Sequence, residues 1–512
     1  MRLVNRPSAR WLVHECLTFL VVLAVADGVA AARPTAATSG TKPWWRNEVA
    51  VVTWASLENA ADRKWLPFVK EIGSRIADRG VFYGHYPERM PPKNAPASYF
   101  HAHGLRVTSF LSVEQWDPAP GAVTQLIDAM KGQLDDGCDG VHLDMFFSIR
   151  DYDRAVCQTT LAVAAARRMR DELHAYGRAR YGREVMLAGN VWQLEDRFAL
   201  EAAQILDVAW IESWGQSDLE VVRMARVARA LDRGHKPVWY HFQPATDAEP
   251  RVKRLANLPK ALFASCLMEG AVFLCNYQYP VLITKPPAQR KEGQGDPGAW
   301  EMMPINQRWK DAVLRYARFA RMHKELLLDA SPQAPVLVAF RADDVASANR
   351  LMDALLRQHV SFNVLVYGDD PFGAPTVDDL RGYACVVTPS EGLESLAGKA
   401  KVFVGVDPFL RAMPREVAEF LSVEGAPQVI GRVFTKGNRV LLHLKQYGYL
   451  DETDELAPSP PVRVTLSAPS VTRGFCVSPD RKARMTLKVE RQAARVSFTV
   501  PGIQYYALVV LE

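Results

Sequence analysis

The chain has 512 residues, of which 48% are apolar and 23% are charged, an ordinary balance for a globular protein. Its formal net charge of +5 is small for this length and gives no basis for nucleic-acid binding, which needs clustered Lys and Arg. The length exceeds that of one ordinary domain, so we expect about two to four domains.

The N-terminus has the pattern of a secretory signal peptide. Arg2, Arg6 and Arg10 form a basic region, Leu17–Ala24 is a short apolar run, and Ala30–Ala32 offers small residues for cleavage. The apolar run is short for a membrane span. We therefore predict a signal peptide over residues 1–32, a Pro/Ala/Thr/Ser linker over 33–42, and export to the bacterial periplasm or beyond. No stable membrane insertion is expected after cleavage.

Cysteine usage does not predict a disulfide framework. Of the seven cysteines, Cys16 lies in the signal peptide and the others lie mostly within apolar runs, without a CxxC motif. Small buried apolar residues are the favoured interpretation. One bridge, between Cys138 and Cys157, remains open, and zinc ligation is not expected.

Residues 43–330 alternate between strand-like and helical patterns. The strands are apolar throughout, which is typical of parallel strands buried on both faces. Eight such units over this length predict a closed (β/α)8 TIM barrel. The expected strands are Glu48–Ala55, Gly80–His85, Leu105–Val113, Gly140–Phe146, Glu184–Val191, Leu206–Ser213, Lys236–His241 and Gly270–Tyr277.

Two smaller domains are predicted after the barrel. Pro280–Glu301 breaks the pattern with Pro, Gly and charge, so we expect a loop above the barrel, followed by a closing helix over Asn306–Leu327. Residues 331–430 have the alternation of a small doubly wound α/β domain. Residues 431–512 contain short alternating strands separated by turns, which favours a β-sandwich.

Two acidic residues end two of the predicted barrel strands. The segment Gly137–Phe147 reads GCDGVHLDMFF and places Asp144 where the fourth strand stops. The segment Ile205–Trp214 reads ILDVAWIESW and places Glu212 at the end of the sixth. The carboxyl ends of barrel strands hold active sites, and alternate strands share an inward-facing layer. Two carboxylates in one cavity can hydrolyse a glycosidic bond, so Asp144 and Glu212 are the predicted catalytic pair.

Aromatic and polar residues at the other strand ends are candidate sugar contacts. Aromatic rings stack on the apolar faces of sugars, while hydroxyl groups need polar partners. Core packing is the alternative for any single ring. The aromatic candidates are Trp54, Trp116, Trp192, Trp214, Trp239, Tyr240, Tyr277 and Tyr279, and the polar candidates are Glu114, Asn190, His241, Gln243 and Asn276.

Three histidines require separate interpretations. His142 lies two residues before Asp144, so it faces the same interior and could donate a hydrogen bond there, although a core histidine is an equal alternative. His101 and His103 form an H-x-H pair like that of metal-dependent hydrolases. The pair precedes the third strand, at the wrong end of the barrel, so we expect no metal and no cofactor.

These strand ends resemble those of retaining α-glycosidases. The G-x-D-G-x-x-x-D pattern before and at Asp144, with Glu212 in an E-x-W setting, is similar to the α-galactosidase-like clan and the dextranase family. The resemblance covers the barrel, but its specific part is two strand ends. It implies that Asp144 is the nucleophile and Glu212 the acid/base, which would need a raised pKa from apolar neighbours such as Trp214.

The domain order also resembles certain β-galactosidases whose middle domain is similar to class I glutamine amidotransferases. The corresponding strand here reads VFVGVD (Val402–Asp407) and lacks the nucleophilic Cys. The resemblance therefore implies subunit assembly, hence a possible homo-oligomer, and no amidotransfer. Those β-galactosidases carry a Glu acid/base on the fourth strand, often after Asn, where this chain has Asp144.

The sequence thus predicts an exported, three-domain glycoside hydrolase that acts on an oligo- or polysaccharide. The alternative is a catalytically silent carbohydrate-binding or assembly protein on the same barrel. A metal-dependent hydrolase is a weaker alternative. The sugar, the linkage, and endo or exo action are left open, because they depend on loop shape.

Overall fold

The computed structural model describes residues 42–53, 76–82, 97–113, 116–144, 146, 160–213, 217–234, 236–242, 257–276, 304–395, 400–449, 453–468, 471–492 and 494–512. The chain divides into Met1–Pro43 and one compact unit, Trp44–Glu512. The predicted signal peptide and nearly all of the linker lie outside the described residues. Within the described residues, no helix is long and apolar enough to cross a membrane.

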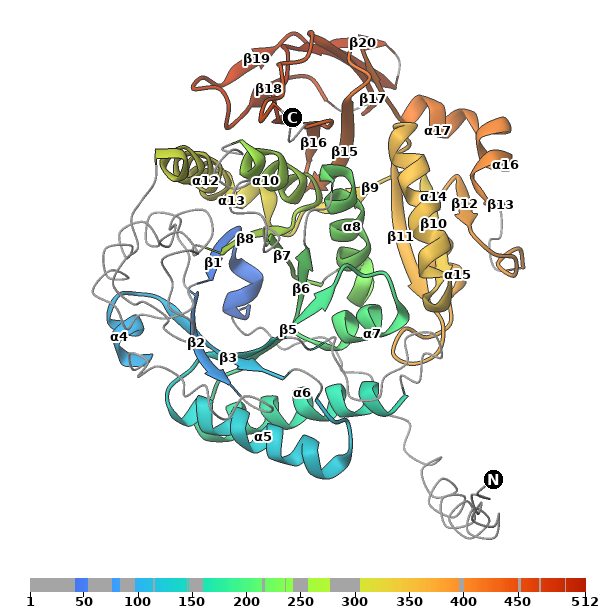
Figure 1. The fold of residues 1–512 in the computed structure, drawn as a ribbon. Helices are drawn as coiled ribbons and strands as arrows, with labels where there is room; N and C mark the ends of the chain where they lie inside the picture. The colour runs from blue at the N-terminus through green and yellow to red at the C-terminus, as the bar shows by residue number, and fades with distance from the viewer. Residues whose placement is uncertain are drawn as a thin grey trace, which may run out of the picture. The chain divides into compact units, whose positions relative to one another are not determined.

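Eight parallel strands form a curled sheet in the first part of the compact unit (Figure 1). Their order is β1-β8-β7-β6-β5-β4-β3-β2, and β1 and β2, at the two ends of this order, contact each other. The predicted barrel and its eight strands are confirmed, with β2 four residues earlier than expected. The strands are β1 Ala50–Thr53, β2 Ile76–Phe82, β3 Arg106–Ser112, β4 Gly140–Asp144, β5 Met186–Trp192, β6 Val208–Ser213, β7 Val238–Phe242 and β8 Val272–Asn276.

Helices alternate with these strands and lie outside the sheet, except η1 Trp44–Asn47, which precedes β1 and contributes Trp45 to the core inside the barrel (Figure 1). Local signals fix their ends: Asp196 caps α7 by accepting from the Ala199 N–H at 2.8 Å, and Gly270 ends α10 with φ 66°. The helices are η1 Trp44–Asn47, α4 Ala97–Ala102, α5 Pro120–Asp135, α6 Thr160–Tyr181, α7 Arg197–Ile205, α8 Asp218–Gly234, α10 Leu258–Glu269, α12 Pro304–Met322 and α13 Lys324–Leu327.

The two faces of the barrel strands pack in different cores. Side chains alternate along a strand, so neighbouring residues face opposite ways. One set packs against the surrounding helices and includes Leu187, Ile211 and Tyr240. The other set fills the interior of the barrel and consists of Trp45, Val51, Met186, Ala188, Val208, Trp210, Trp239, Val272 and Leu274.

A four-stranded parallel sheet follows, in the order β11-β10-β12-β13. The order reverses between β10 and β12, as a doubly wound sheet requires, so this prediction is confirmed. The strands are β10 Val336–Arg341, β11 Phe362–Tyr367, β12 Cys385–Thr388 and β13 Lys401–Val404, and the helices are η3 Ala342–Asp344, α14 Val345–Arg357, α15 Val377–Leu380, α16 Val406–Arg411 and α17 Arg415–Phe420.

Two antiparallel sheets close the chain and enclose a separate apolar core, as predicted for a β-sandwich. Their orders are β14-β17-β21-β20 and β19-β18-β22-β16-β15-β9. The sandwich begins earlier than expected, because β9 pairs with β15 before the α/β domain starts. The strands are β9 Ser331–Gln333, β14 Leu421–Glu424, β15 Val429–Lys436, β16 Arg439–Gln446, β17 Val462–Ser467, β18 Gly474–Val477, β19 Met485–Leu487, β20 Glu490–Gln492, β21 Arg495–Val500 and β22 Tyr506–Leu511.

The sandwich is joined to the barrel helices through buried charges. Glu269 at the end of α10 is paired with Arg226 of α8 at 2.5 Å and with Arg432 of β15 at 3.5 Å, and all three side chains are buried. Lys445 of β16 reaches Asp218, the first residue of α8, at 2.6 Å. Buried charges of this kind require their partners, because one left alone in the interior is strongly unfavourable. The start of α8, which follows the strand of Glu212, is anchored in this way.

Candidate active site

Asp144 and Glu212 share the carboxyl end of the barrel sheet. Asp144 is the last residue of β4, and Glu212 is next to last in β6. Glu212 lies on the same strand face as Trp210 and Val208, which belong to the interior core. Asp144 lies on the same face as His142, whose ring stacks on that of Trp210 with centroids 3.8 Å apart. Both acids therefore project from the interior face, as the sequence predicted.

One amide connects the two acids. Asn190 lies on β5, between their strands, and its side-chain Nδ2 donates to Asp144 Oδ1 at 2.7 Å and to Glu212 Oε2 at 2.5 Å. Because the same nitrogen reaches both, these two oxygens lie no more than about 5 Å apart. The arrangement can therefore bring two carboxyl groups to one bond of a substrate.

Phe146 holds the turn that follows Asp144. Its backbone N–H donates to Asn190 Oδ1 at 3.1 Å, and its carbonyl accepts the Trp116 indole N–H at 2.9 Å. Its ring stacks on Trp116 with centroids 5.0 Å apart. Gly189 makes room for it, because a Cβ there would lie 3.2 Å from Phe146 Cβ and 3.1 Å from Leu206 Cδ1. The direction in which β4 ends is thus fixed by packing on β5.

The chain leaves β5 in a sparsely populated conformation. Gln193 and Leu194 both have positive φ, 46° and 49°, which is uncommon for residues other than Gly and costs energy. Leu194 is buried, and its carbonyl accepts from Asn349 of α14 at 3.5 Å. Two successive left-handed residues beside Asn190 were not predictable from the sequence, which has no Gly at either position.

Two histidines and two tryptophans fill the space beneath the acids. Trp210 of β6 contacts both His142 and His241, and its ring lies 5.7 Å from that of Trp239. His241 is opposite Glu212 in the register of β6 and β7. Burial, with a smaller contribution from the nearby His142, lowers the pKa of His241 to about 3. A neutral His241 therefore adds no positive charge beside Glu212.

Three predicted sugar contacts occupy other positions, and one of them, Trp239, is fully buried in the core inside the barrel. Tyr240 is fully buried on the outer face of β7, in the core shared with the helices, so its assignment as a sugar contact is wrong. Its neighbour His241 faces inward instead, because side chains alternate. Trp116 is 6% exposed and packs on Phe146, so it supports the turn after Asp144 and is not an open stacking surface.

For the remaining predicted sugar contacts, the structure gives either the backbone position alone or no position. Trp192 ends β5 and Asn276 ends β8, both at the carboxyl end of the sheet. Trp54, Glu114, Gln243, Trp214, Tyr277 and Tyr279 lie outside the described residues, as does the predicted loop Pro280–Glu301. Their role as sugar contacts stays a prediction.

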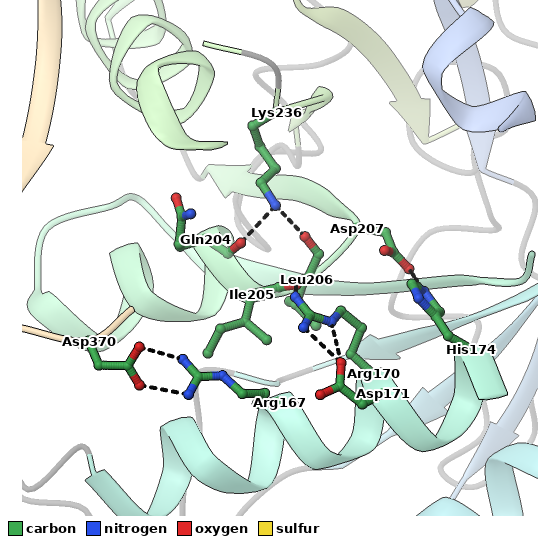
Figure 2. A network of polar contacts seen from close by, with 10 residues as sticks. All are labelled: Arg167, Arg170, Asp171, His174, Gln204, Ile205, Leu206, Asp207, Lys236 and Asp370. Atoms are coloured by element: carbon green, nitrogen blue, oxygen red, sulfur yellow. Dashed lines mark hydrogen bonds and ion pairs between the residues drawn. The ribbon is translucent and has the colours of Figure 1, made fainter. Parts of the chain in front are cut away.

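A second pair of acids lies at the amino ends of the same two strands. Asp139 directly precedes β4 and accepts from the Val107 N–H at 3.0 Å, and His101 Nε2 lies 2.8 Å from its carboxylate. Asp207 directly precedes β6 and accepts from the Leu187 N–H at 2.7 Å. His174 Nε2 lies 2.8 Å from the Asp207 carboxylate (Figure 2). Neither acid was assigned a role from the sequence, although Asp139 is the first Asp of the G-x-D-G-x-x-x-D pattern.

The surroundings of Asp139 favour its ionised form, and a buried lysine lies near Asp207. Burial alone would raise the pKa of Asp139, but hydrogen bonds from the Val107 N–H, Arg183 and His101 hold it below its usual value. Near Asp207, the Lys236 ammonium donates to the carbonyls of Gln204 and Leu206 at 2.8 and 2.6 Å (Figure 2). Burial lowers the pKa of Lys236 to about 8. His101, of the H-x-H pair, contacts the buried Asp139 carboxylate at the amino end of the barrel.

The described part of the chain has few groups suited to metal binding or thiol chemistry. No group of three or more His, Cys, Asp or Glu residues there could hold a metal ion. Cys138, Cys266, Cys385 and Cys476 are buried, and burial raises the pKa of Cys385 to about 12. Cys157 lies outside the described residues, so the predicted pairing with Cys138 stays untested.

Solved structures with a similar fold are carbohydrate-active enzymes. An α-L-fucosidase isoenzyme 2 from Paenibacillus thiaminolyticus has a TM-score of 0.63 at 10% identity, over 91% of this chain and 99% of the fucosidase. A cycloisomaltooligosaccharide glucanotransferase from Paenibacillus sp., solved with cycloisomaltoheptaose, has a TM-score of 0.53 at 9% identity, over 92% of this chain and 86% of the transferase.

The chain therefore has a fold found among glycoside hydrolases, a barrel followed by β domains. At such low identity the likeness concerns the fold alone. No protein-family model and no curated protein sequence matches the chain.

Proposed function

We propose that this protein is an exported glycoside hydrolase that cleaves its substrate with retention of anomeric configuration. The observation that carries the proposal is the bridged pair, Asp144 and Glu212, at the carboxyl end of the barrel. Retaining enzymes need two carboxyl groups about 5–5.5 Å apart, whereas inverting enzymes need about 6.5–9.5 Å to admit a water. The bridge by Asn190 keeps the nearest oxygens of the two acids within about 5 Å, which supports the retaining mechanism.

In the proposed mechanism Asp144 is ionised and Glu212 is protonated at the start. Asp144 attacks the anomeric carbon while Glu212 gives its proton to the departing oxygen, which leaves a glycosyl ester on Asp144. Glu212, now ionised, then takes a proton from a water molecule that attacks the same carbon and releases Asp144. Each proton and each bond is accounted for without a metal or a redox cofactor.

The assignment of roles follows the positions of the two acids. Asp144 is held by the turn at Phe146 and by Asn190, which suits a group that must attack one carbon atom. Glu212 is 4% exposed and has the neutral His241 beside it in the sheet register, which suits a group that must be protonated before the reaction. The resemblance to the dextranase family assigns the same roles.

The substrate class is proposed from the similar structures. They are an α-L-fucosidase and a cycloisomaltooligosaccharide glucanotransferase. We propose an α-glycoside in an oligo- or polysaccharide and a panel that begins with α-L-fucosides and α-1,6-linked glucans. Chromogenic α- and β-glycosides and bacterial exopolysaccharides complete the panel.

The test combines this panel with product stereochemistry. The mature protein should release product from at least one member of the panel, and proton NMR should detect first the anomer with the configuration of the substrate. Release of the opposite anomer would contradict retention. Binding to a panel sugar without turnover at any pH would favour the silent carbohydrate-binding protein.

A further inference from the structure

Asn190 uses its side chain on three partners at once. It is 1% exposed, its Nδ2 donates to Asp144 and Glu212, and its Oδ1 accepts from the Phe146 N–H. These partners come from the end of β4, the turn after it, and β6. Asn190 itself is level with Trp210 in the register of β5 and β6, one inward residue below Glu212.

The orientation of the amide follows from chemistry. A backbone N–H can only donate, so the atom of Asn190 that faces Phe146 must be its oxygen. The nitrogen must then face the acids, and an amide has two N–H groups, one for each carboxylate. Both donors of Asn190 are therefore used inside the protein, which leaves none for a sugar hydroxyl.

We propose that Asn190 is a positioning residue that holds the nucleophile and the acid/base at a fixed separation, instead of the sugar contact suggested by its place at a strand end. The catalytic role of Asn190 rests on the proposed function. The coupling of Asp144 to Glu212 through one amide does not depend on it.

The coupling has an electrostatic consequence. Two carboxylates within about 5 Å of each other resist ionising together, and a donor shared by both favours their charged forms. Removal of the amide should therefore raise the apparent pKa values of the pair. Among the described residues, the other titratable groups on the inward faces of β4 and β7 are His142 and His241, and burial keeps His241 neutral above about pH 3.

The test uses the full mature chain and three variants. Asn190→Ala removes the amide, and Asn190→Asp replaces it with a group of the same size that donates from neither oxygen when ionised. Asn363→Ala is the matched control, because Asn363 on β11 also bridges two side chains, donating to Tyr383 Oη at 3.1 Å and accepting from Arg432 at 2.9 Å. Its site is in the α/β domain.

The first readout does not depend on turnover. Carboxyl carbons of Asp and Glu are labelled with ¹³C, and the two signals are identified by their loss in Asp144→Asn and Glu212→Gln. We expect Asn190→Ala to raise the apparent pKa values of the pair by about one unit and Asn190→Asp to raise them further, with no change in Asn363→Ala. A folded Asn190→Ala or Asn190→Asp protein that titrates like the unmodified one would overturn the proposal.

The second readout separates positioning from substrate binding. We expect Asn190→Ala to lower kcat by about 10- to 100-fold with little change in KM, and to move the acid limb of the pH profile upward. A sugar ligand would instead show mainly a raised KM with an unshifted pH profile, which would also overturn the proposal. If the unmodified protein cleaves no glycoside while Asn190→Ala shifts the titration, the proposed function fails and the coupling stands.

Discussion

Strands β4 and β6 each have an acidic residue at both ends, and the acids at the two ends have different partners. Asp139 and Asp207 precede the strands, and Asp144 and Glu212 end them. The amino-end acids each meet a histidine and a backbone N–H of the neighbouring strand. The carboxyl-end acids share a neutral amide with each other.

We infer that partners, more than burial, separate the structural acids from the acids that we propose to be reactive. Asp139 and Glu212 are 1% and 4% exposed, so burial alone does not separate them. Asp139 is compensated by Arg106 and Arg183, which favours its ionised form and ties strands together. Glu212 is joined through that amide to another acid, whose negative charge resists the ionisation of Glu212, which suits its proposed acid/base role.

The largest effect should come from the carboxyl-end acids. Asp144→Asn and Glu212→Gln remove the proposed nucleophile and proton donor while keeping size, so each should lower kcat/KM on the order of 10⁴-fold. Their unfolding midpoints should stay close to that of the unmodified protein. Activity assays and thermal denaturation check both parts, and full activity of purified Asp144→Asn would remove the nucleophile assignment.

Asp139→Asn should instead lower stability and leave kcat nearly unchanged. It leaves Arg106, Arg183 and His101 without their carboxylate, and we expect a loss of about 2 kcal/mol in the free energy of unfolding. The side chains of Arg106 and Arg183 are 42% and 36% exposed, so water compensates part of the loss. Denaturant unfolding measures it. A large loss of kcat with unchanged stability would contradict the structural role of the acid at the amino end.

Gly189→Ala should lower both stability and activity, because the added methyl group would crowd Phe146. The added methyl group would lie 3.1–3.2 Å from Leu206 and Phe146, and overpacking of this kind costs about 1–2 kcal/mol. Displacement of Phe146 should also disturb its hydrogen bond to Asn190 and lower kcat. The control is Gly132→Ala in α5, where a Cβ meets nothing within 4 Å. Equal behaviour of the two variants would show that Phe146 does not depend on Gly189.

The smallest effect is the pH dependence of the amino-end acid. The pKa of Asp139 is lowered in the folded state from a usual value of 3.8, so its contribution to stability is present above that value and is lost as the pH falls through the lowered one. The stability gap between the unmodified protein and Asp139→Asn should therefore be constant just above about pH 4 and shrink below it. Unfolding curves between about pH 2.5 and 5.5 test this, and a gap that widens on acidification would contradict it.

The barrel was predictable because its strands are buried on both faces and read as apolar runs of regular spacing. Positions such as Asp144 and Glu212 follow from that reading, since a polar residue that stops an apolar strand lies at its carboxyl end. The helical pattern that closes the barrel was predicted over Asn306–Leu327 and found as α12 and α13.

The features that the sequence did not predict depend on how neighbouring strands are aligned. Tyr240 and His241 are neighbours in sequence, and only the register of β7 decides which faces the interior. The bridge from Asn190 depends on the level of β5 relative to β4 and β6, which no single segment specifies. Asp139 lies in a turn, and its partners come from α4, β3 and the segment between α6 and β5, so the local sequence does not predict these contacts.

Trapping of the covalent intermediate tests the central claim most directly. A fluorinated activated glycoside of the cleaved class should form a slowly hydrolysed ester, and mass spectrometry of the digested protein should locate it on Asp144. Glu212→Gln should still form the ester when the leaving group needs no proton. A sugar attached to another residue, or rapid turnover with inversion and no trapped ester, would contradict the account.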